Sequence, residues 1–172
     1  MFLCNLKIAI IIIEFKKMEI ILSQTVKNES ETKLLVEQFC KKLEAIPNFT
    51  IFFQGALGAG KTFFVQQLLK HFGINTPINS PTFTYVQEYN GDQKNFAHFD
   101  LYRLESDEQF LEKGFGEIIE DDTWNKLVEW PQKISDDLQE EFSGTSFWVT
   151  IEHQPHTTRN ITITTTNTVK SV

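Results

Sequence analysis

The chain has 172 residues, of which 41% are hydrophobic and 23% are charged, values typical of a globular protein with one domain. Its formal net charge of -7 argues against a protein that binds nucleic acid by itself, because phosphate contacts need a basic face. The cysteines, Cys4 and Cys40, are too few for a disulfide framework and form no zinc-binding pattern. We therefore expect a cytoplasmic protein that reaches RNA, if at all, through protein partners.

The N-terminal segment contains an apolar run, Ile8–Ile13, which is far shorter than the ~20 residues that span a bilayer. Lysines follow the run and no cleavage site of small residues does, so the segment differs from a signal peptide. Met18 offers a second plausible start. We expect residues 1–17 to be an N-terminal extension, 18–166 to be one domain and 167–172 to be a tail, with no membrane contact.

Helical and strand patterns alternate along the expected domain. Asn28 and Glu31 have the spacing of a helix cap and its partner, and Asn90-Gly91 is typical of a tight hairpin turn. In chain order, the predicted elements are a helix from Asn28 to about Ala45, a strand Thr50–Gln54, a helix Lys61–Phe72, paired strands Phe83–Tyr89 and Phe96–Tyr102, a helix starting at Ser106, a strand Lys126–Trp130, a helix of about Gln132–Phe142, and strands Phe147–Glu152 and Ile161–Thr166.

One segment carries a complete phosphate-binding motif. Gly55-Ala56-Leu57-Gly58-Ala59-Gly60-Lys61-Thr62 matches G-x-x-x-x-G-K-[ST], with a predicted strand before it and a predicted helix after it. Its glycines allow backbone N–H groups to converge on phosphate, and the helix start adds a positive dipole. In such a loop Lys61 reaches the β- and γ-phosphates, and Thr62 offers its hydroxyl to Mg²⁺.

These patterns together predict the fold class. Alternating strands and helices favour an α/β protein, while the hairpin requires an antiparallel pair. We expect a P-loop NTPase-like, three-layer α/β fold whose sheet is mixed, mainly parallel, and includes an antiparallel hairpin.

Four short motifs stand out: L-G-A-G-K-T at 57–62, S-P-T-F at 80–83, H-F-D-L-Y-R-L at 98–104 and V-E-W-P at 128–131. Together they resemble the TsaE family, the bacterial ATPase component of tRNA threonylcarbamoyladenosine synthesis. The resemblance runs from about Ser30 to Pro131, and it departs from the family at Ala56, where an acidic residue is usual. It implies an ATPase that binds ATP and Mg²⁺ and resets the TsaB–TsaD complex between turnovers. In that reading TsaB and TsaD carry the transfer, and tRNA is reached only through them.

Three further positions are candidates for the chemistry. Thr82 either contacts Mg²⁺ and the γ-phosphate or only forms a strand-entry turn; the resemblance favours the first reading. Asp100 and Glu129 each follow an apolar strand, which suits a pair of carboxylates beside Mg²⁺, one on a metal-bound water and one on the attacking water. The sequence does not assign these two roles.

The remaining motif residues admit two readings each. His98 shares a strand face with Asp100, and we favour a structural histidine over a site residue. The resemblance places Trp130 against adenine, whereas the residue pattern alone favours a core tryptophan beside Pro131. Arg103 either packs locally or touches the γ-phosphate or a partner.

The expected site contains nucleotide contacts, metal ligands and catalytic groups. The nucleotide contacts are Gly55, Leu57, Gly58, Ala59, Gly60, Lys61, Thr62, Thr82 and Trp130; the metal ligands are Thr62, Asp100 and Glu129; the catalytic groups are Lys61, Asp100 and Glu129.

Other functions of a P-loop protein are less favoured. A GTPase is disfavoured because Asn125-Lys126-Leu127-Val128 has valine where N-K-x-D has the aspartate that recognises guanine. A small-molecule kinase needs a cationic lid, and the chain has no arginine-rich segment. A nucleotide sensor that does not hydrolyse its ligand stays open.

Overall fold

The computed structural model describes residues 17–155 and 158–167, so residues 1–16 and 168–172, most of the expected extension and tail, lie outside the described residues. The described chain forms a seven-stranded sheet in the order β1-β7-β6-β2-β5-β4-β3. Its strands are β1 (Lys17–Val26), β2 (Phe49–Gln54), β3 (Val86–Asn90), β4 (Asn95–Asp100), β5 (Trp124–Glu129), β6 (Thr145–His153) and β7 (Arg159–Asn167).

The sheet is parallel in its centre and antiparallel at both sides. Strands β6, β2, β5 and β4 run parallel, β3 pairs antiparallel with β4, and β7 pairs antiparallel with both β6 and β1. The predicted mixed α/β sheet with its hairpin is confirmed. Antiparallel pairing is more extensive than expected, because β1, to which the sequence analysis assigned no element, adds to β7.

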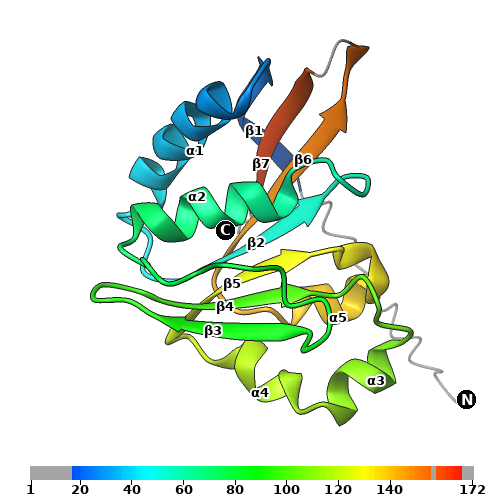
Figure 1. Ribbon diagram of the computed structural model, residues 1–172. Coiled ribbons are helices and arrows are strands. Elements are labelled where there is room, and N and C mark those ends of the chain that lie inside the picture. The colour runs from blue at the N-terminus through cyan, green and yellow to red at the C-terminus, as the bar shows by residue number, and fades with distance from the viewer. Residues whose placement is uncertain (1–16, 156–157, 168–172) are drawn as a thin grey trace, which may run out of the picture.

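Helices cover both faces of this sheet. Figure 1 shows α1 (Glu29–Leu43) and α2 (Lys61–His71) over one face, and α3 (Asp107–Glu112), α4 (Phe115–Glu120) and α5 (Asp136–Glu140) over the other. A short 3₁₀-helix, η1 (Pro131–Lys133), follows β5. The predicted cap of the first helix is confirmed: Asn28 Oδ1 accepts from the Glu31 N–H, and Glu31 reaches back to the Lys27 N–H. Such a cap contributes ~1 kcal/mol.

Phenylalanines fill a separate core on each face of the sheet. Phe53 of β2 packs against Phe64 of α2 with ring centroids 5.5 Å apart, while its neighbour Phe52 packs against Phe142 at 5.3 Å. Successive side chains of a strand point to opposite faces, so β2 is anchored from both sides. The loop that follows β2 therefore starts from a rigid position.

Several element ends differ from the predicted ones. The helix expected over about Gln132–Phe142 is divided into η1 and α5, because Ser135 lies between them and its side chain caps α5 through the Leu138 N–H. The strand expected from Phe83 begins only at Val86, since residues 82–84 form a turn and Tyr85 has a φ of 65°. Strand β4 ends at Asp100, two residues early.

Among the described residues, no helix is both long and apolar enough to cross a membrane.

Candidate phosphate-binding site

The motif loop connects β2 to α2 with a backbone that depends on glycine. Gly55, Gly58 and Gly60 have φ values of 154°, 76° and 112°. At Gly55 a Cβ atom would also lie 2.6 Å from the carbonyl oxygen of Ile151 in β6. The loop is thus packed directly against a neighbouring strand, and no larger residue fits at its first position.

Lys61, the first residue of α2, lies across this loop. Its Nζ donates to the carbonyl oxygens of Gly55 at 2.9 Å and Ala56 at 3.0 Å, and it lies 3.7 Å from the ring centre of Trp130. The residue is only 4% exposed. Burial lowers the pKa of this ammonium group, and the negative charges of Glu129 and Asp100 act in the opposite direction.

Glu129 ends β5 and is held at both carboxylate oxygens. Oε2 accepts from the Thr62 hydroxyl at 3.0 Å, and Oε1 lies 2.9 Å from Nε2 of His98. The glutamate is 2% exposed and the histidine 0%. The carboxylate therefore connects β4 and β5 to the start of α2.

Asp100 ends β4 and pairs in register with Glu129 of β5. Its Oδ2 accepts hydrogen bonds from the hydroxyls of Ser80 and Thr82, the latter at 2.6 Å, and its Oδ1 accepts from the Tyr102 N–H at 3.1 Å. Parallel neighbours end at the same edge of a sheet, so both carboxylates lie beside the motif loop. Thr82 lies in the turn before β3, and its hydroxyl faces this carboxylate.

Trp130 turns the chain back over the loop. Its φ of 62° lies in the left-handed region, which costs a residue with a Cβ roughly 1–2 kcal/mol. The turn brings the indole over Lys61 and places it 5.0 Å from the ring of Tyr102. Trp130 is half-buried beside the loop and also packs against the core on the α3–α5 face of the sheet.

A cavity of about 400 Å³ collects most of the predicted site residues. It is lined by Leu57, Gly58, Gly60, Lys61, Thr62, Phe63, Ser80, Thr82, Asp100, Tyr102, Glu129 and Trp130. The two predicted residues outside this lining, Gly55 and Ala59, form the base of the same loop. Ala59 instead lines an adjoining cavity of about 360 Å³ on the β7 side.

Two contacts at the site were not predictable from the sequence, and Arg103 was left with two readings. Ser80 lies within one of the quoted motifs, but its hydroxyl had no predicted role, and Arg159 had none either. Nε of Arg159 donates to the carbonyl oxygen of Ala59 at 2.7 Å, across 100 positions of sequence. No local pattern predicts that contact. Arg103 stacks on the exposed Phe83 ring at 4.2 Å.

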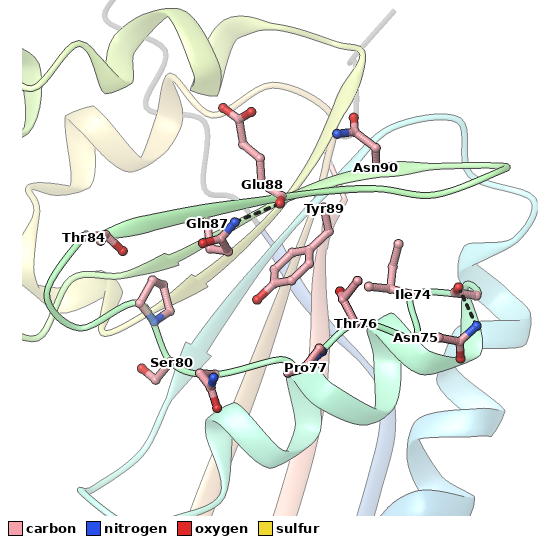
Figure 2. A pocket seen from close by; sticks show the side chains of 13 residues that line it. Ile74, Asn75, Thr76, Pro77, Ser80, Thr84, Gln87, Glu88, Tyr89 and Asn90 are labelled. Atoms are coloured by element: carbon pink, nitrogen blue, oxygen red, sulfur yellow. Dashed lines mark hydrogen bonds between the residues drawn. The ribbon is translucent and has the colours of Figure 1, made fainter.

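A larger cavity of about 820 Å³ lies behind the Ser80 segment. It is bounded by β3 and by the chain that follows α2, and Figure 2 shows the Tyr89 hydroxyl pointing toward the segment that carries Pro77 and Ser80. Its lining is mostly neutral amides and hydroxyls. Ser80 lines both this cavity and the smaller one. The segment around Ser80, whose hydroxyl donates to Asp100, therefore lies between the two cavities.

The site has the chemistry of a magnesium–phosphate site. Its donors are oxygens, from Thr62, Asp100 and Glu129, and Mg²⁺ takes one or two carboxylates while it keeps several waters. The glycines of the loop expose their backbone N–H groups without a Cβ atom in the way, and helix α2 starts at the end of the loop. These residues fit a nucleoside triphosphate with its metal ion.

Comparison with known proteins gives one consistent family. The model of the family described as "Threonylcarbamoyl adenosine biosynthesis protein TsaE" matches residues 26–161. This range contains every residue of the site described above.

Individual relatives agree with this match. The chain is 41% identical to the tRNA threonylcarbamoyladenosine biosynthesis protein TsaE of Rickettsia typhi over 111 residues, which is 64% of this chain and 74% of that protein. It is 35% identical to the Bacillus subtilis protein of the same name over 114 residues, 66% and 69% of the two chains. The crystal structure of Bacillus subtilis YdiB superposes with a TM-score of 0.65 at 26% identity, covering 88% of this chain and 87% of that one.

Proposed function

Because the chain belongs to the TsaE family of threonylcarbamoyladenosine biosynthesis proteins, we propose that it binds ATP with Mg²⁺ at the loop between β2 and α2 and hydrolyses it. One observation carries this proposal. Lys61, Thr62, Asp100 and Glu129 meet in a single cavity, where the parallel strands β2, β4 and β5 end. A cation, a hydroxyl and two carboxylates around a glycine loop are what phosphoryl transfer from ATP requires.

The loop and the start of α2 bind the phosphates. Backbone N–H groups of residues 58–62 and the helix dipole attract the negative oxygens. Lys61 exchanges its bonds to the carbonyls of Gly55 and Ala56 for bonds to the β- and γ-phosphates. Charge that develops on the γ-phosphate as water attacks in line is then stabilised by this ammonium.

The two carboxylates have different roles in this proposal. Thr62 and Glu129 would hold Mg²⁺, and the ion would supply positive charge that stabilises the phosphate oxygens. The Thr62 hydroxyl donates its hydrogen bond to Glu129 Oε2, so its oxygen lone pairs would remain available to the ion. Asp100 holds the hydroxyls of Ser80 and Thr82, so it sets the position of the threonine that senses the γ-phosphate.

Trp130 closes the phosphate side of the site. Its indole covers the Lys61 ammonium at 3.7 Å, a cation–π contact that keeps water from this charge. Trp130 is then a nucleotide contact next to the phosphates.

The partners follow from the family rather than from a surface of this chain. We propose that the protein acts on the TsaB–TsaD complex, that hydrolysis resets this complex, and that tRNA is bound by the partners. An ATPase whose site is completed by a partner turns over slowly alone.

The test is ATP turnover of the full chain with and without purified TsaB and TsaD. We expect strong stimulation by the partners, and we expect Lys61→Ala to lower ATP affinity by about 10- to 100-fold, since a charged hydrogen bond is lost. Lys70→Ala, which removes an exposed lysine from the same helix, is the matched control and should behave like wild type. Normal ATP binding and hydrolysis by Lys61→Ala would contradict the assignment of the loop. Absence of stimulation, with phosphate passed to a small molecule instead, would identify a kinase.

A further inference from the structure

His98 is buried where a structural role alone gives little reason for an imidazole. It lies in the middle of β4, opposite Leu127 of β5, and is 0% exposed. Its Nε2 contacts Glu129, but among the described residues its Nδ1 has no hydrogen-bond partner. A buried polar atom without a partner lowers stability, so an apolar side chain would suit this core position better.

The contact with Glu129 favours one tautomer of the neutral ring. An ionised carboxylate only accepts hydrogen bonds, so the proton between the two groups is on Nε2. In the neutral ring Nδ1 then carries only a lone pair. His98 is thus a donor directed at one oxygen of a carboxylate whose other oxygen accepts from Thr62.

We propose that His98 is a positioning residue, which holds Glu129 so that its Oε2 stays on Thr62 at the metal side of the phosphate site. This inference rests on the proposed function, because it acts through Glu129. Without the bond to Oε1, the carboxylate is free to rotate, and the Thr62 hydroxyl loses its fixed acceptor. Groups that orient a ligand of a metal site typically change activity by about 10- to 100-fold when removed.

Two substitutions separate this role from packing. His98→Leu fills the apolar space and removes the donor, whereas His98→Gln places an amide N–H near the position of Nε2. Phe96→Leu is the matched control, since Phe96 lies two residues away on the same strand face and packs against Phe49 and Phe72, away from Glu129.

The measurements are kcat and KM for ATP with TsaB and TsaD present, ATP affinity, and Tm. We expect His98→Leu to lower kcat by about 10- to 100-fold with ATP affinity changed by less than about threefold, and His98→Gln to recover about tenfold. Phe96→Leu should lower Tm and leave kcat unchanged. A wild-type kcat in His98→Leu would overturn the proposal. So would a result in which both His98 variants lose the same factor in kcat and the same number of degrees in Tm.

A double substitution and a spectrum complete the test. His98→Leu combined with Glu129→Gln should be no slower than Glu129→Gln alone, because the histidine acts through the glutamate. Additive losses would contradict this. Nitrogen-15 spectra of the histidine rings, assigned by comparison with His98→Leu, should show the proton on Nε2; a proton only on Nδ1 would overturn the proposal without reference to activity. Failure of the wild type to bind ATP would instead refute the proposed function.

Discussion

Glu129 receives a hydrogen bond on each carboxylate oxygen, from Thr62 and from His98, and is almost fully buried. A buried charge is retained in a fold only where partners compensate it. Asp100, its register neighbour, has a different set of partners in Ser80, Thr82 and the Tyr102 N–H. The two carboxylates thus have different environments, from which we infer different roles. Glu129 would act at the metal, and Asp100 would position Thr82, the threonine that senses the γ-phosphate.

Replacing Glu129 by glutamine tests that division. The amide keeps the volume and one acceptor but removes the charge, so we expect ATP affinity within about threefold of wild type and turnover lower by about 100-fold or more. ATP binding by calorimetry and phosphate release with TsaB and TsaD present measure the two effects. Glu88→Gln, at an exposed position of β3, is the control. Unchanged turnover would remove Glu129 from the mechanism.

Strand β7 reaches the phosphate loop, although it follows that loop by about 100 positions of sequence. Its first residue, Arg159, donates to the carbonyl oxygen of Ala59 at 2.7 Å, and β7 itself is held between β6 and β1. The loop is therefore supported from two directions, by the Ile151 carbonyl against Gly55 and by Arg159 against Ala59. The antiparallel side of the sheet takes part in the geometry of the site.

Arg159→Ala should weaken ATP binding without unfolding the chain. Loss of a charged donor to the loop is expected to reduce ATP affinity by about three- to tenfold, because the loop must then be ordered by the nucleotide itself. Thr162→Ala in the same strand removes a hydroxyl that contacts Ser23, away from the loop, and should have wild-type affinity. Equal affinities of the two variants in calorimetry would show that β7 does not support the loop.

The stability of the whole chain should depend on one buried lysine at the opposite end of the sheet. Lys126 is 0% exposed, and its Nζ donates to the Asp121 carbonyl and the Ser143 hydroxyl, each at 2.6 Å. Burial lowers the pKa of this amine to about 8 in the folded chain, with Asp122 and Asp121 opposing the shift. The amine is protonated at neutral pH at a cost in folding free energy.

The unfolding free energy should therefore rise with pH. Unfolded lysine has a pKa near 10.4, so between pH 8 and 10 the unfolded chain binds more protons than the folded one, and stability increases as pH rises. We expect a gain of about 2 kcal/mol from pH 7.5 to 9.5 from this group, measured by urea denaturation. Lys126→Met should lack this part of the pH dependence. A pH profile of Lys126→Met that matches the wild type would contradict the assignment.

The local elements of the site were determined by sequence. The phosphate loop with its strand and helix, the Asn28 cap and the mixed α/β sheet were predictable, since each depends on neighbouring residues. A hairpin near Asn90 was also predictable, but Asn90 pairs with Asn95, so residues 91–94 form a longer connection than the expected tight Asn90-Gly91 turn. The phosphate-loop residues, Thr82, Asp100, Glu129 and Trp130 were also named, through the motifs that resemble the TsaE family.

Tertiary structure decided which of these groups contact one another. The pairing of β1 with β7, the support of the loop by Arg159, the partners of each carboxylate and the place of Trp130 over Lys61 join segments far apart in the chain. Local patterns carry no information on such contacts, because strand order and register fix them only after the sheet has assembled. For the same reason the sequence left His98 with two readings, structural or in the site, and only the parallel register of β4 and β5 places its ring on Glu129.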